Sequence, residues 1–158
     1  MDGRRGIPAV FKKYIVQLCQ LHFQQAILRK TTQRPKSELG MLLKLAVKQF
    51  IKERWSRELF TEIYDYLSIN YKAYLDEKNE QENYTHKEMR AAMRSIKTAS
   101  LYLFSNLDYP QLNIPNTTNR IDGGVNPKLK ELVRNHRGMN LQRRDKLIQV
   151  LLASLGKK

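Results

Sequence analysis

Two Asp-Gly pairs are the residues of this sequence that could carry out the most demanding chemistry. Asp2 precedes Gly3, and Asp122 precedes Gly123 within "NIPNTTNRIDGGVN" (113–126). Asp-Gly is a common turn signal, so a turn is the first interpretation of each pair. Two carboxylates are also what a two-metal site needs, because anionic oxygens hold Mg²⁺ ions that activate an attacking oxygen and stabilise a leaving one. The residues by themselves leave both interpretations open.

Cys19 and His22 form a C-x-x-H pair, a spacing that suits a metal ion. A structural zinc site needs four ligands. The other candidates of these types are His86 and His136, and the sequence has no second cysteine. We therefore expect a packed thiol and a hydrogen-bonded imidazole at the end of a strand rather than a zinc site.

The chain becomes strongly basic after Asp122, where only Glu131 and Asp145 offset the positive charge. The cations of this basic tail are Lys128, Lys130, Arg134, Arg137, Arg143, Arg144 and Lys146. Guanidinium and ammonium groups replace the counterions condensed on a nucleic-acid backbone, so the pattern is typical of a phosphate-contacting surface. A solvated helix surface is the alternative interpretation.

The charge of the whole chain points to the same class of partner. Its 158 residues include 29 Lys and Arg against 15 Asp and Glu, which gives a net charge of +14, and 41% of the residues are hydrophobic. Such an excess indicates a polyanionic partner, with nucleic acid the first candidate and an anionic membrane surface the second. No apolar run is long enough to span a bilayer, so we expect no membrane insertion and a soluble, intracellular chain.

Trp55 is the only tryptophan and lies in the basic context "KERWSRE" (52–58). It falls between two predicted helices, so one interpretation is that its ring packs at their junction. The other interpretation is that the ring stacks on an unpaired base of DNA.

The first elements expected to position these residues are a strand and three helices. "YIVQLCQL" (14–21) is β-branched and aromatic enough for a buried strand, although a helix is also possible. Residues 22–30 read as a helix, which the stretch containing Pro35 ends. Ser37 and Ser56 are expected to cap the two helices that follow, both of which carry apolar residues at helical spacing.

The remaining helices are predicted from their start signals. Thr85 and Glu88 have the spacing of a capping box. Asn126 is expected to cap a helix with Pro127 in its first turn, and Asn140 is expected to cap a last helix that ends near residue 155. Residues 37–104 therefore read as all helix, with a loop between them and the basic tail.

Several stretches together resemble a known family. They are "MDGRRGIPAVF", "IVQLCQLHFQQAILRK" and the long segment that ends in "TTNRIDGGVNPKLKELVRNHRG". In this order they resemble the rear half of bacterial insertion-sequence transposases of the Mutator-like class, which have a DDE catalytic site on an RNase H-like fold. The resemblance extends from Asp2 to about Leu152, and "TTNRIDGG…LK…RNHRG" is its most specific part.

The resemblance implies a mainly α chain that is a truncated C-terminal part of an α/β RNase H-like fold. One or two strands would remain, and an all-helical insertion would interrupt the fold. The implied domains are residues 1–30, a remnant of the core; residues 31–112, the insertion; and residues 113–158, the C-terminal helices with the basic tail.

The resemblance also assigns roles to residues. Asp2 matches the second catalytic acid and Asp122 the third, which makes both ligands of Mg²⁺ or Mn²⁺; many relatives have Glu at the position of Asp122. Arg120 would lie near the scissile phosphate. The signature of the family would be carried by Cys19, His22, Thr118, Asn119 and Gly123.

Complete relatives cut and join transposon DNA by two-metal phosphoryl transfer. Their first acid lies on an earlier strand, so we expect a truncated transposase that is inactive alone. Mg²⁺ or Mn²⁺ is the cofactor of complete relatives, and a chain that binds no metal is the alternative. DNA, a second copy or an intact transposase would be its partners, in the cytoplasm of a bacterium and associated with the nucleoid. The alternatives are a non-catalytic helical DNA-binding module, a degenerate transposase remnant and a plain helical interaction protein.

Overall fold

Helices make up most of the chain in the computed structural model, which describes residues 10–11, 13–118 and 121–155. They fall into two compact units, one ending at Thr117 and one beginning at Thr118. The helices of the first unit are α2 (Gln20–Thr31), α3 (Glu38–Lys52), α4 (Arg57–Asn70), α5 (Lys72–Asp76), α6 (Lys87–Ser100), α7 (Ser105–Asp108) and the 3₁₀ turn η1 (Pro110–Leu112). The prediction of a mainly α chain is confirmed.

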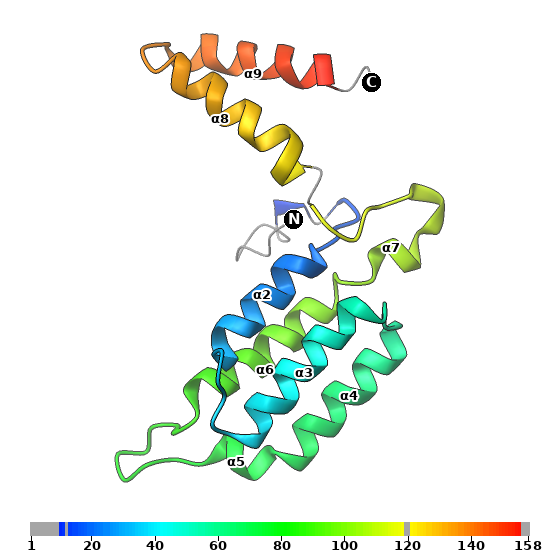
Figure 1. The fold of residues 1–158 in the computed structure, drawn as a ribbon, viewed down its shortest axis with the longest axis vertical. Helices are drawn as coiled ribbons and strands as arrows, with labels where there is room; N and C mark the ends of the chain where they lie inside the picture. Colours follow the sequence, from blue (N-terminus) through cyan, green and yellow to red (C-terminus); the bar gives the residue numbers. More distant parts are fainter. Residues whose placement is uncertain (1–9, 12, 119–120, 156–158) are drawn as a thin grey trace. The chain divides into compact units, whose positions relative to one another are not determined.

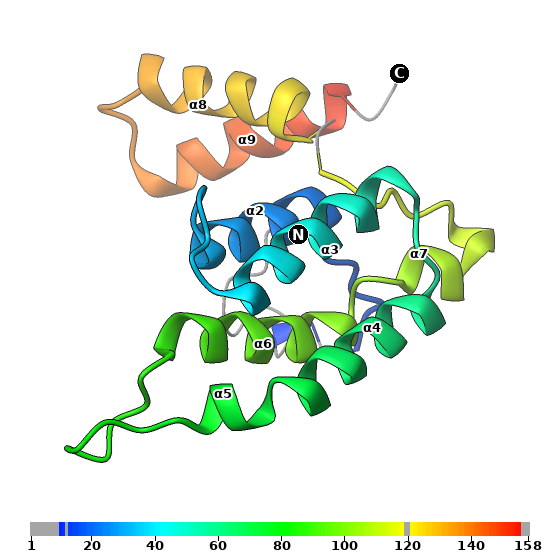
Figure 2. The ribbon, with the colours of Figure 1, turned by 60° about the horizontal axis from the view of Figure 1, so that its bottom comes forward.

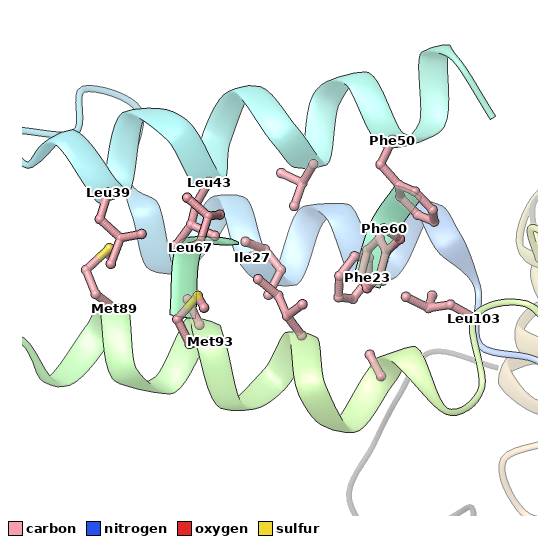
Figure 3. Packing of buried hydrophobic residues seen from close by; sticks show 14 of the residues in the cluster. Phe23, Ile27, Leu39, Leu43, Phe50, Phe60, Leu67, Met89, Met93 and Leu103 are labelled. Carbon is pink, nitrogen blue, oxygen red and sulfur yellow. The ribbon is translucent and has the colours of Figure 1, made fainter. Parts of the chain in front are cut away.

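Four of these helices form a bundle in the first unit. In Figures 1 and 2, α2, α3, α4 and α6 run side by side, and α2 and α4 each pack against both α3 and α6. The apolar stripes predicted for α3 and α4 face inward, as do the apolar residues of α6, because burying them removes apolar surface from water. Figure 3 shows Met89 and Met93 of α6 pointing toward Leu39 and Leu43 of α3.

Aromatic rings fill the other end of this core. Phe50 is 1% exposed. Its ring centroid lies 5.9 Å from Phe23, 5.1 Å from Phe60 and 5.9 Å from Phe104, with tilted or edge-on geometry. Because edge-on pairs add to the hydrophobic gain of burial, Phe50 joins α2, α3, α4 and the segment after α6 at one point.

Two predicted helix caps are present in the bundle. The Ser37 hydroxyl accepts a hydrogen bond from the backbone N–H of Gly40 (3.2 Å), and the Ser56 hydroxyl accepts one from Leu59 (3.3 Å). The backbone N–H of Glu58, together with the Ser56 hydroxyl, also holds the pKa of the Glu58 carboxyl below its usual value. Both predictions are confirmed.

The predicted strand over residues 14–21 is wrong. Residues 15–19 have no regular structure, and α2 begins at Gln20. The backbone groups of this segment are bonded to the end of α6 and to α7: Leu18 N–H donates to the carbonyl of Tyr102 (2.9 Å), and the Ser105 hydroxyl donates to that of Val16 (2.7 Å). A strand requires a neighbouring strand to complete its ladder. Within the described ranges, the only β pairing is an isolated bridge between Lys78 and Tyr84, so no remaining strand is present there.

The predicted capping box at Thr85 is also wrong. Helix α6 begins at Lys87 after His86, which makes no side-chain cap. Thr85 instead closes the turn that connects α5 and α6, because its backbone N–H donates to the carbonyl of Glu77 (3.0 Å) beside the Lys78–Tyr84 bridge. Thr85 is therefore part of this turn, two residues before the first residue of α6, and does not cap the helix.

The second unit contains a π-helical turn, η2 (Ile121–Val125), and two helices, α8 (Asn126–Asn135) and α9 (Leu141–Leu155). Asn126 was expected to cap α8 but is its first residue, since η2 leads directly into the helix despite two glycines. The predicted cap of α9 is confirmed, because the Asn140 side-chain oxygen accepts a hydrogen bond from Arg143 N–H (2.9 Å).

The predicted domain boundaries at residues 30 and 112 remain predictions. In the structure, packing contacts cross the first boundary, and the first compact unit extends past the second. Helix α2 lies mostly within residues 1–30, yet it packs against α3 and α6 of the predicted insertion. The compact first unit ends at Thr117, inside the predicted C-terminal domain.

Candidate nucleic-acid interface

A basic stripe runs along α8. Lys130, Arg134 and Arg137 repeat at intervals of four and three residues, so they lie on the same side of the helix and of the turn that follows it. All three are exposed. Together with Leu129 and Val133 they line one shallow, open depression. This arrangement gives a concave surface whose rim is positively charged.

Helix α9 adds the other cations of the basic tail. Arg143 and Lys146 are exposed, whereas Arg144 is half-buried on the side of the helix that also carries Leu147 and Leu151. These last three residues lie at helical spacing, and each is partly covered. Lys128, at the start of α8, is exposed.

The cations of the basic tail have no carboxylate partner in the part of the chain that the structure describes. The ion pairs seen there all lie in the first unit: Arg57 with Asp108, His86 with Glu77 and Arg90 with Asp76. Exposed cations without a carboxylate partner can neutralise phosphates, and the release of the counterions condensed on the nucleic acid is what favours such binding.

The C-x-x-H segment lies against the segment that leads to Asp122. The backbone N–H of Gln20 donates to the carbonyl of Asn116 (2.9 Å), and the side-chain amide of Asn116 donates to the Gln20 side-chain oxygen (3.2 Å). Gln20 is 8% exposed and stands between Cys19 and His22. Two segments 96 residues apart are thus joined by a pair of hydrogen bonds.

Gln17 and Gln20 also hold the connection after α6. The side-chain amide of each donates to the carbonyl of Leu103, at 2.8 Å from Gln17 and 3.1 Å from Gln20. The Gln17 side-chain oxygen accepts from Asn106 N–H (2.9 Å). We call Gln17, Gln20 and Asn116 the glutamine clasp, since they connect three stretches of the first unit.

Replacing Gln20 with leucine is expected to lower the free energy of unfolding by about 1–3 kcal/mol, because the partly buried Asn116 amide loses its Gln20 partner and the Leu103 carbonyl keeps only the bond from Gln17. Hydrogen exchange of the segment around Gln20, whose backbone N–H bonds to Asn116, should become faster. Gln25→Leu is the matched control, since Gln25 lies on the exposed side of α2. Equal effects of the two substitutions on stability and exchange would contradict a role for the clasp.

Cys19 and His22 occupy the start of α2. Cys19 is 2% exposed and directly precedes the helix, while His22 is half-buried in its first turn. The packed-thiol interpretation agrees with this burial, but the residues stand at the beginning of a helix rather than at the end of a strand.

The structure describes the predicted acid site only in part. Asp2, Asn119 and Arg120 lie outside the described residues, and for Asp122 only the backbone is described, within η2. Thr118 is half-buried. Gly123 has open space where a side chain would begin, so packing does not require glycine there.

Trp55 lies at the junction of α3 and α4, half-buried. Its ring stands edge-on to Phe50, with the centroids 6.3 Å apart, and its indole N–H donates to the Glu53 carboxylate (3.2 Å). This agrees with the junction interpretation. Base stacking by Trp55 stays a prediction.

Comparisons of the chain with protein-family models, with curated proteins and with solved structures gave no match. No helix within the described part of the chain is both long and apolar enough to cross a membrane.

Proposed function

We propose that this chain is part of a DNA transposase of the Mutator-like, DDE class, and that its basic tail binds the DNA backbone. In this proposal the second unit and the residues around Cys19 belong to an RNase H-like catalytic domain. Residues 31–112, which contain the helices from α3 to η1, correspond to the helical insertion of that domain. The chain would act on bacterial DNA, together with a second copy or with an intact transposase.

The pairing of Gln20 with Asn116 is the observation that carries the proposal. In this class the second and third acids must meet at one metal site, although they are far apart in the sequence. The clasp supports such a meeting, since it joins the C-x-x-H segment to Asn116, and Asp122 follows six residues later. Six residues span at most about 20 Å, which is the upper limit that the chain sets on the distance between Asn116 and Asp122.

Asp2 and Asp122 would hold the divalent cation, which neutralises charge on the reacting phosphate when bound. The role of the basic tail is separate. Its cations, among them Lys130, Arg134 and Arg137, would position DNA by contacts with the backbone that carry no sequence information. The basic tail follows Asp122 in the sequence, and its positive charge would offset the repulsion between the acids and the DNA.

The dependence of DNA binding on Mn²⁺ tests the proposal. Binding of the purified chain to a labelled duplex should tighten when millimolar Mn²⁺ is added, and Asp122→Asn should lose that gain. Asp145→Asn is the matched control, because it removes the same charge from an exposed position of α9. A gain that survives in Asp122→Asn would argue against Asp122 as a metal ligand and against the transposase assignment.

The alternative is a non-catalytic helical module that binds DNA, which a degenerate transposase remnant could also be. The exposed cations of α8 and α9 favour it, because contacts with a phosphate backbone need no catalytic acid. This alternative predicts DNA binding that weakens with salt and responds to Mn²⁺ identically in the unmodified chain and in Asp122→Asn.

A further inference from the structure

A second basic surface lies on the bundle, far from the basic tail in sequence. Lys44, Lys48 and Lys52 of α3 repeat every four residues and therefore lie on one side of the helix. That side is opposite to the one carrying Leu43 and Phe50, which are each 1% exposed in the core. Lys48 and Lys52 are exposed and Lys44 is half-buried.

The loop between α2 and α3 extends this surface. The Lys44 ammonium group donates a hydrogen bond to the carbonyl of Gln33, which holds the loop next to α3. Arg34 and Lys36, which follow Gln33, are both exposed. We define the α3 face as Arg34, Lys36, Lys44, Lys48 and Lys52.

The α3 face carries one sign of charge. None of its cations has a carboxylate partner among the residues that the structure describes, as judged from the ion pairs found there. The acid at the start of α3, Glu38, lies near Tyr71, and after burial it is the main cause that raises the pKa of the Tyr71 hydroxyl. The charge of this face is therefore available to a partner.

Helix α4 differs from α3 in charge, because it exposes Glu58 and Glu62. Helix α6 also exposes cations, at Lys87, Arg94 and Lys97, beside the acid Glu88. It differs from the α3 face in that acids pair with other cations near it: Arg90 lies 2.6 Å from Asp76, and His86 lies 2.7 Å from Glu77. Helix α6 therefore supplies a comparison surface of similar charge.

The geometry points to the α3 face as a binding surface for the backbone of a second duplex DNA. This inference rests on the proposed function, because a reaction that joins transposon DNA to target DNA must hold two DNA segments. Three lysines spaced about 6 Å apart along a helix axis present their charge in a line, as a phosphate backbone does. The contacts are with phosphates, so binding should not depend on sequence.

An anionic membrane is a poorer fit to the same surface. A helix that binds at a membrane interface inserts a broad apolar side between the lipids. The apolar side of α3 is already buried in the bundle, where Leu39, Leu43, Val47 and Phe50 are each at most 3% exposed. The exposed residues of α3 are Glu38, Met41, Leu45, Lys48 and Lys52, so its outer side carries two single apolar side chains among charges rather than a broad apolar side.

A bridging experiment tests the inference with the full chain. An unlabelled duplex is immobilised, the protein is added, and retention of a second, fluorescent duplex is measured. The α3 variant is Lys48→Gln with Lys52→Gln, and the tail variant is Lys130→Gln with Arg134→Gln. The control, Arg94→Gln with Lys97→Gln, removes the same charge from exposed positions of α6. Thermal melts verify that each variant is folded.

The unmodified chain and the control should bridge the two duplexes. The α3 and tail variants should each retain about tenfold less of the second duplex, since each loses two phosphate contacts, while the α3 variant still binds a single duplex. If the unmodified chain binds no duplex, the proposed function fails. If it binds a duplex without bridging, or if the α3 variant bridges normally, only the inference is overturned. Loss of binding to phosphatidylserine vesicles in the α3 variant, with DNA bridging intact, would also overturn it.

Discussion

Replacing Phe50 with alanine is expected to lower the free energy of unfolding by about 3–5 kcal/mol, the range typical of removing a buried phenylalanine. The ring is 1% exposed and contacts Phe23, Phe60 and Phe104, which come from three other segments. Its loss leaves a cavity where four stretches meet, and they cannot all close over it. Domains of this size have a total stability of about 5–15 kcal/mol, so the variant should be close to unfolding.

Urea titration of both proteins measures this effect. Phe11→Ala serves as the control, because Phe11 is 43% exposed and its one ring contact among the described residues is with Tyr14. The control should change the free energy of unfolding by less than about 0.5 kcal/mol. A loss for Phe50→Ala as small as that of the control would show that the aromatic end of the core is not tightly packed in solution.

Neutralising the α8 stripe is expected to have the largest effect on DNA binding. In the triple variant Lys130→Gln, Arg134→Gln and Arg137→Gln, the logarithm of the affinity should fall less steeply with the logarithm of salt concentration. The slope should change by about 2.7, since each lost phosphate contact removes about 0.9. Affinity near physiological salt should fall by roughly 30-fold, about threefold for each contact. Fluorescence anisotropy of a labelled duplex over a salt series provides both quantities.

A triple variant of α6 distinguishes an effect of the α8 stripe on DNA binding from an effect of the net charge of the chain. Lys87, Arg94 and Lys97 are exposed, and their replacement by glutamine removes the same three charges. The α6 variant should keep most of the slope of the unmodified chain. Equal changes in the two triple variants would mean that DNA responds only to net charge, which would contradict the assignment of the basic tail as the binding surface.

The bundle helices were predictable because local signals and long-range packing agree in them. In α3 the Ser37 cap marks the beginning, and Leu39, Leu43, Val47 and Phe50 follow at helical spacing. Each of these apolar residues is buried. The same kind of agreement identified α4 and α9 together with their caps.

The errors arose where tertiary contacts replaced local preference. The run "YIVQLCQL" suits a strand as well as another kind of buried segment. In the structure its backbone bonds to a loop instead of a strand, because the Leu18 N–H donates to the carbonyl of Tyr102. In the same way, pairing of Thr85 with Glu77 removed a predicted cap. Neither contact has a signature within the local sequence.

The cations of the candidate site could be predicted from the sequence, but the hydrogen bonds of the glutamine clasp could not. Charge is visible in sequence, and the cations of α8 are exposed as that charge suggested. The bonds between Gln20 and Asn116 cross 96 residues and have no local signal. One hint was present, since Gln17 and Gln20 are amides inside an otherwise apolar run, and buried amides require partners. The lysines of the α3 face were missed because they are spread among apolar residues of a core helix.

Because of the position of Trp55, the intrinsic tryptophan fluorescence of the chain reports on the first unit only. Trp55 is the only tryptophan, and its ring packs edge-on against Phe50 in the first unit. Intrinsic fluorescence therefore follows melting of the bundle, whereas circular dichroism follows all helices, α8 and α9 included. If the two signals change at different temperatures, the units melt separately, and α8 with α9 can be studied as an autonomous helical hairpin.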